Sequence, residues 1–238
     1  MAIIAGVDGC ATGWIVVQRD TESRRLSRCI APDFLTVLDK TKGASIVAVD
    51  IPIGLLDAAV PGGRACDIAA RKLLGPKRGS SVFPSPVRAT LDCRTYHQAS
   101  KANQDSSSAG IRISQQCFGI LPKIREVDRA MTPELQRKIR EIHPELCFFA
   151  LNGGCAITQP KRTDVGKDVR LVLLQKHGFG SLSSEAVQPI PPGVETDDML
   201  DACAACWTAE RILIGTAVCI PSACPARDSR GLSMEMWY

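Results

Sequence analysis

The segment that most constrains this chain is an apolar run near its start that ends in a carboxylate. Residues 3–7 read Ile-Ile-Ala-Gly-Val, and Asp8-Gly9 follows before a second apolar run at 13–17. A strand this apolar is typical of the middle of a parallel or mixed sheet, where both faces are covered. A carboxylate there is costly unless it is paired, hydrogen-bonded or bound to a cation. Because Asp-Gly is also a hairpin-turn signal, a turn-forming and a functional interpretation of Asp8 both stay open.

The first fifty residues alternate in a way that predicts an α/β fold with a mixed sheet. We expect strands at about 2–8, 13–19 and 25–30, a helix at 33–40 and a strand at 45–50. The strand at 45–50 ends in Asp50, and it must return to pair with the first strand. Two strands of this sheet therefore end in an aspartate.

Residues 54–140 break this alternation and predict a helical and loop insertion within a single domain of 1–238. Inside the insertion we expect helices at 67–74, 115–131 and 134–140, a proline loop at 79–86 and a polar loop at 99–110. After it we expect a strand within 139–151 that contains Glu145, helices at 164–177 and 196–214, and a linker at 189–195.

The last helix carries acids that could join those of the sheet. Thr196 as N-cap and the helix dipole account for Asp197 and Asp198. Asp201 lies deeper and shares a face with Asp198, where like charges repel unless a cation lies between them. If the strands ending at Asp8 and Asp50 pair in parallel, they lie about 4.8 Å apart, and Asp201 could supply a third ligand. Oxygen ligands alone favour Mg²⁺ or Mn²⁺, and two such ions suit phosphoryl chemistry.

Element order and several motifs resemble a known family. The order is similar to that of the ribonuclease H-like superfamily, and the final helix is similar to that of RuvC-type Holliday-junction resolvases. More closely, the chain resembles the DUF429 family of predicted RNase H-like nucleases. The motifs that carry the resemblance are Gly6-Val7-Asp8-Gly9-Cys10, Asp50-Ile51-Pro52-Ile53-Gly54-Leu55, Ser80-Ser81-Val82-Phe83-Pro84 with Pro86 and Arg88, His143-Pro144-Glu145, Asp197-Asp198-Met199-Leu200-Asp201-Ala202 and Gly231-Leu232.

This resemblance implies an RNase H-like mixed five-stranded sheet with flanking helices. It places Asp8, Asp50 and Asp201 at metal-binding positions and makes Asp198 or Glu145 a fourth carboxylate. It implies Mg²⁺ or Mn²⁺ as cofactor and metal-dependent, two-metal-ion hydrolysis of phosphodiester bonds. The acid that ribonuclease H proper carries early in its first helix has no clear counterpart here, as in the resolvases and unlike the hybrid-cleaving enzymes.

Basic and hydroxyl side chains outside the acidic positions are candidates for binding phosphate. Arg78, Ser81 and Arg88 belong to the proline loop and its flanks, and Lys161 precedes the helix at 164–177. Such side chains commonly contact backbone phosphates, although Lys161 could equally flank a helix cap. We therefore expect nucleic acid or a small phosphorylated molecule as partner.

Composition leaves these alternatives open. A net charge of +4 permits nucleic acid as a partner without indicating it. No apolar run approaches the roughly 18–20 residues of a membrane span, and Asp8 interrupts the first one, so we expect neither a signal peptide nor a membrane partner. Eleven scattered cysteines are typical of buried thiols in a reducing cytoplasm. The oligomeric state does not follow from the sequence.

Two other functions stay compatible with the sequence. An ATP-dependent kinase or ATPase of the actin and sugar-kinase type would share this sheet and its first-strand Asp-Gly turn. However, Pro52 follows Asp50 where such proteins carry a second glycine-rich phosphate hairpin. A non-catalytic module that binds nucleic acid or a phosphorylated metabolite could keep the acids for structural reasons.

Overall fold

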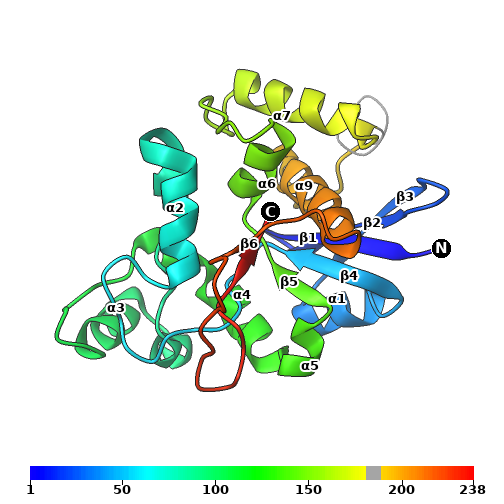
Figure 1. Ribbon diagram of the computed structural model, residues 1–238. Helices are drawn as coiled ribbons and strands as arrows, with labels where there is room; N and C mark the ends of the chain where they lie inside the picture. Colours follow the sequence, from blue (N-terminus) through cyan, green and yellow to red (C-terminus); the bar gives the residue numbers. More distant parts are fainter. Residues whose placement is uncertain (181–188) are drawn as a thin grey trace. The chain divides into compact units, whose positions relative to one another are not determined.

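The computed structural model describes residues 1–180 and 189–238, and these form two compact units (Figure 1). The first unit comprises Met1–Asp50, Lys138–Val218 and Trp237–Tyr238, and the second comprises Ile51–Arg137 and Cys219–Met236. The predicted insertion at 54–140 lies almost wholly in the second unit. That unit also includes a segment near the C-terminus that the sequence did not connect with it.

A five-stranded mixed sheet forms the centre of the first unit, with strand order β3-β2-β1-β4-β5. The first three strands make an antiparallel meander, β4 returns parallel to β1, and β5 lies parallel to β4. The strands are β1 (Ile3–Cys10), β2 (Gly13–Asp20), β3 (Leu26–Ala31), β4 (Ala44–Val49) and β5 (Ile139–Glu141). This arrangement confirms the expected α/β fold with an RNase H-like topology.

Helices cover both faces of this sheet. On one face, Trp14 of β2 packs edge-on against Phe34 of α1, with ring centroids 5.4 Å apart. On the other face, Ile4 and Cys10 of β1 share a core cluster with buried residues of α6, α7 and α9, and α9 packs along β1 and β4 (Figure 1). Among the described residues of this unit, the helices are α1 (Phe34–Lys40), α6 (Pro144–Leu151), α7 (Asp164–Lys176) and α9 (Thr196–Leu213).

The second unit is mainly helical. Its α-helices are α2 (Ala65–Arg78), α3 (Tyr96–Asp105), α4 (Gln115–Ala130) and α5 (Pro133–Gln136), with short 3₁₀ turns η1 (Gly79–Ser81) and η2 (Arg88–Asp92). Two further short strands, β6 (Cys219–Ile220) and β7 (Met236–Trp237), flank the C-terminal loop. None of the described helices is both long and apolar enough to span a membrane.

Several boundaries differ from those predicted, each for a local reason. The helix predicted at 67–74 continues to Arg78 beyond a kink at Gly75, whose φ is 68°. The polar stretch at 99–110 was predicted as a loop, but α3 runs through its first half, because a capping box between Thr95 and Gln98 starts a helix there. The helix predicted at 134–140 is only the single turn α5, and β5 follows it.

Candidate acidic site

Strand register brings Asp8 and Asp50 side by side. Gly6 pairs with Ala48 and Val7 with Val49, so Asp8 and Asp50 occupy the next matched positions of two parallel strands. The Asp50 N–H donates to the carbonyl of Val7 over 3.0 Å, which continues the ladder by one residue. A side-chain hydrogen bond joins the two carboxyl groups. The parallel pairing expected from the sequence is therefore present.

Gly6 allows α9 to approach β1 closely. A Cβ atom at position 6 would lie less than 3.0 Å from the backbone of Cys206 and Ala202, so only glycine fits this contact. Side chains two residues apart on a strand share a face, which means that Asp8 points to the same side of the sheet as Gly6. Asp201 directly precedes Ala202, so the close approach of α9 brings Asp201 toward Asp8.

The three aspartates affect one another electrostatically. Burial, followed by the charges of Asp50 and Asp201, raises the pKa of Asp8 well above its usual range. Burial and the Asp201 charge raise the pKa of Asp50 to about 7, and burial raises that of Asp201 to about 6. Asp8 and Asp201 are almost fully buried, whereas Asp50 is half-buried. The site therefore concentrates negative charge that the protein compensates only in part.

Lys161 supplies positive charge to this centre. It lies between α6 and α7, and its Nζ is 2.7 Å from Oδ2 of Asp201 and 3.5 Å from Oδ2 of Asp197. The sequence suggested Lys161 as a contact for substrate. The structure places it directly on one of the predicted metal ligands.

Asp198 forms part of the start of α9. Its Oδ2 accepts the N–H of Glu195 over 3.0 Å, in a capping box whose N-cap is Glu195. The prediction of Thr196 as N-cap was therefore wrong by one residue. Asp198 still contributes to the raised pKa of Asp8, so its charge reaches the site while one of its oxygens holds the helix end.

Glu145 lies on a helix, and the strand predicted around it is wrong. Pro144 occupies the first turn of α6, where its missing N–H costs nothing, and Nδ1 of His143 accepts the N–H of Glu145 over 3.2 Å. The Glu145 carboxylate binds Arg170 of α7 through both oxygens, at 2.8 and 3.0 Å. Both side chains are buried. Both carboxylate oxygens of Glu145 therefore bind Arg170, in a buried ion pair next to the acidic site.

The remaining predicted substrate contacts belong to the second unit. The hydroxyl of Ser81 donates to the carbonyl of Arg78 over 2.6 Å, and Arg78 ends α2. The Arg88 guanidinium lies 3.1 Å from Asp128 and also pairs with Asp228. Arg88 therefore acts within its own unit as the centre of an ion-pair network. The role of these three residues as substrate contacts stays a prediction.

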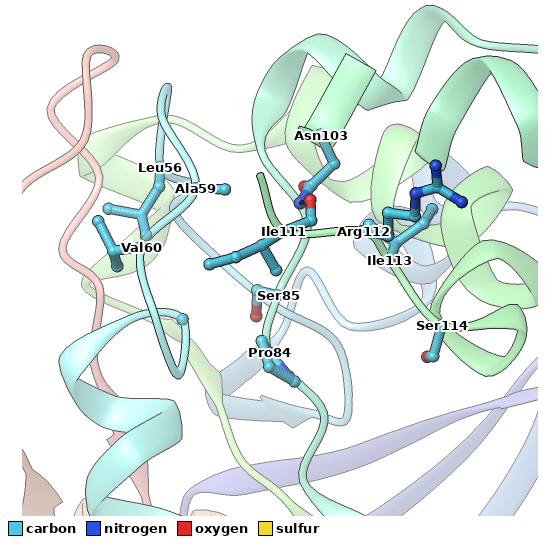
Figure 2. A pocket seen from close by; sticks show the side chains of 11 residues that line it. Leu56, Ala59, Val60, Pro84, Ser85, Asn103, Ile111, Arg112, Ile113 and Ser114 are labelled. Carbon is cyan, nitrogen blue, oxygen red and sulfur yellow. Dashed lines mark hydrogen bonds between the residues drawn. The ribbon is translucent and has the colours of Figure 1, made fainter. Parts of the chain in front are cut away.

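A separate cavity lies within the second unit (Figure 2). It has a volume of about 120 Å³, and apolar side chains such as Leu56, Val60 and Ile111 line much of it. Asn103 also faces it, but its Oδ1 accepts the N–H of Val87 over 3.0 Å and its Nδ2 donates to the carbonyl of Ile111 over 2.8 Å. The amide of Asn103 is therefore used for local structure.

The cysteines follow the expected pattern in part. Six of the eleven are buried as free thiols, and Cys155 and Cys224 are exposed. Cys203 and Cys206 are completely buried against β1, and burial raises the pKa of Cys203 to about 12. A thiol with this pKa stays protonated at neutral pH, which fits the expectation that this pair packs in the core.

The sequence missed two residues that shape the site. Arg170 reads as one charge on an amphipathic helix, yet it is the buried partner of Glu145. Asp197 was explained by the helix dipole alone, yet it shares Lys161 with Asp201. No spacing in the sequence predicts either contact, because each joins segments that are distant along the chain.

The sheet order, with Asp8 inside β1 and Asp50 directly after β4, defines the class of this protein: an RNase H-like α/β protein with an acidic centre. More specifically, the chain belongs to the DUF429 family, described as "Protein of unknown function", whose family model matches residues 6–225. This match confirms the family that the motifs predicted. No curated protein and no solved structure matches the chain.

Proposed function

We propose that this protein is a metal-dependent hydrolase of phosphodiester bonds. One observation carries the proposal: Asp8, Asp50 and Asp201 come together from three separate segments, so that the charges of Asp50 and Asp201 raise the pKa of Asp8 and the charge of Asp201 raises that of Asp50. Buried like charges are costly, and perturbed carboxylates of this kind are typical of functional sites. The placement at the carboxyl ends of parallel strands is also where open α/β sheets bind ligands.

The side chains present fit a hard divalent cation. All three are carboxylates, which Mg²⁺ and Mn²⁺ prefer as ligands, and their charge, which Lys161 compensates only in part, favours such an ion. Asp8 and Asp50 would hold it, with Asp201 completing the acidic centre. A bound ion of this type lowers the pKa of water and neutralises charge on a phosphoryl group.

The surrounding residues would position the reacting groups. We assign the fourth carboxylate, which would orient the attacking water, to Asp198, because Glu145 is occupied by Arg170. One oxygen of Asp198 holds the N–H of Glu195 and thereby fixes the side chain. Lys161 adds a positive charge beside Asp201 that suits a phosphate-containing substrate, either nucleic acid or a smaller phosphodiester.

The test is cleavage by purified protein with Mg²⁺ or Mn²⁺. Substrates would include single-stranded and duplex DNA, RNA, an RNA–DNA hybrid, a four-way junction and bis(p-nitrophenyl) phosphate. We expect Asp8→Asn and Asp201→Asn to abolish metal-dependent cleavage, whereas Asp39→Asn, at an exposed position of α1, leaves it unchanged. Cleavage that survives both site substitutions would contradict the proposal. Metal-dependent turnover of ATP without any diester cleavage would favour the kinase alternative instead.

A further inference from the structure

Lys161 reaches the acidic centre from a separate segment of the first unit. Its Nζ contacts Asp201 at 2.7 Å and Asp197 at 3.5 Å, and its side chain is about a third exposed, at 36%. The Asp201 side chain is only 2% exposed. The ammonium group is therefore the main partner of a carboxylate that is otherwise removed from water.

A lysine ammonium is positively charged at neutral pH. The Nζ of Lys161 lies beside two carboxylates, those of Asp201 and Asp197. Lys161 therefore brings a fixed positive charge to the acidic centre.

The aspartates do not all close around one point. Within the described part of the chain, the oxygens of Asp8, Asp50 and Asp201 do not all lie within 4.8 Å of one another. Asp201 is drawn to Lys161, while Asp8 and Asp50 hydrogen-bond to each other. The centre therefore consists of a pair of carboxyl groups and a separate carboxylate with its own cation.

We propose that the Lys161 ammonium takes the place of a second divalent cation, so that the site binds one divalent ion, at Asp8 and Asp50. This inference rests on the proposed function, and it revises the two-ion arrangement that the sequence suggested. A divalent ion on Oδ2 of Asp201 would have to lie next to Nζ, which is already 2.7 Å from that oxygen. Two cations on one oxygen repel each other strongly in a site with little water.

The experiment counts bound Mn²⁺ by titration calorimetry and by the electron paramagnetic resonance signal of free Mn²⁺, without any substrate. We expect one ion per chain in the wild type and two in Lys161→Met, which removes the charge and keeps an unbranched side chain. Lys176→Met is the matched control, because Lys176 is exposed in the last turn of α7, and we expect one ion in that variant. Asp50→Asn should lose the ion that the wild type binds.

Three results would overturn the inference. Two ions in the wild type would show that Lys161 does not exclude the second one, and this result needs no variant to fold. A single ion in a folded Lys161→Met, with circular dichroism matching the wild type, would show that no position is released. No bound Mn²⁺ in any variant would refute the proposed function as well, which separates that failure from the first two.

Discussion

Replacing Asp50 by asparagine should stabilise the metal-free protein at neutral and alkaline pH. Asp50 is an acid that burial and the Asp201 charge keep from ionising freely, with a pKa of about 7 in place of 3.8. An amide of the same shape can keep a hydrogen bond to Asp8 and carries no charge. The carboxyl group of Asp50 therefore lowers the stability of the metal-free protein, and replacing it by an amide should raise that stability.

The size of this effect follows from the shift. A rise of about three pKa units corresponds to about 4 kcal/mol, at 1.36 kcal/mol per unit. The amide of the variant is itself a polar group in a partly buried site, and a hydrogen bond that it fails to make costs part of this free energy, so we expect a net gain of about 1–3 kcal/mol above pH 7.5. A carboxyl whose pKa is raised by folding favours the folded state below pH 3.8 and loses this contribution as the pH rises through about 7. The difference between variant and wild type should therefore grow from pH 4 to pH 7.5.

Urea unfolding followed by tryptophan fluorescence measures this difference directly. All three tryptophans, Trp14, Trp207 and Trp237, belong to the first unit, so the signal reports on the unit that contains Asp50. The buffers need EDTA to remove metal and a reductant to protect the thiols. Asp39→Asn, on the exposed surface, should change stability by less than about 0.5 kcal/mol at every pH. An Asp50→Asn protein that is less stable than the wild type at pH 8, or a gain that does not depend on pH, would refute the reasoning.

Two further substitutions test the packing around the site, and a third tests helix propensity in the second unit. Gly6→Ala should destabilise the protein by about 3 kcal/mol, because its Cβ meets the backbone of α9; Gly43→Ala, which meets nothing within 4 Å, should be nearly neutral in the same urea assay. Glu145→Gln should cost about 3 kcal/mol by leaving the buried Arg170 without its counter-charge, and an unchanged urea midpoint would contradict this. Gly119→Ala should stabilise α4 by about 0.5–1 kcal/mol, because the site is exposed and open, and a lower thermal midpoint by circular dichroism would contradict it.

The sheet was predictable because its signals are local. Apolar runs and a short helix locate β2, β3 and β4 to within one residue. The first strand was predicted to end at Asp8, but β1 continues to Cys10, so Asp8-Gly9 lies inside the strand and the hairpin turn falls at residues 11–12. Asp33, which accepts the N–H of Thr36 over 2.8 Å, marks the start of α1 in the same local way. Pairing of adjacent elements then leaves few topologies to consider.

The Glu145 region was not predictable from the same signals. Residues 146–151 are uniformly apolar, and a short apolar run does not distinguish a buried strand from a buried helix. Pro144 was interpreted as an interruption of a strand, although proline is equally typical of a first helical turn. The decisive contact, with Arg170, joins residues 25 positions apart and depends on how α6 packs against α7.

The acidic centre shows the same division between local and distant information. Register places Asp8 beside Asp50 once β1 and β4 are known to be parallel, and this could be anticipated. Asp201 comes close to Asp8 because Gly6 has no Cβ atom to keep α9 away from β1. Lys161 takes its role by contacting Asp201, which lies 40 positions further along the sequence. Both depend on tertiary packing, which no pattern in the sequence records.

The stability of the metal-free protein and its affinity for a divalent cation both depend on the electrostatic repulsion among the site carboxylates. The negative charge of Asp201, which raises the pKa of Asp50, destabilises the metal-free fold. A divalent ion that binds only the folded state stabilises it, and a tighter-binding ion stabilises it more. An asparagine at position 50 removes the cost and the affinity together. If the acids served only the fold, their replacement would weaken it, as expected for Glu145. A substitution that raises stability at Asp50 and one that lowers it at Glu145 would therefore distinguish a ligand site from a structural ion pair in this protein.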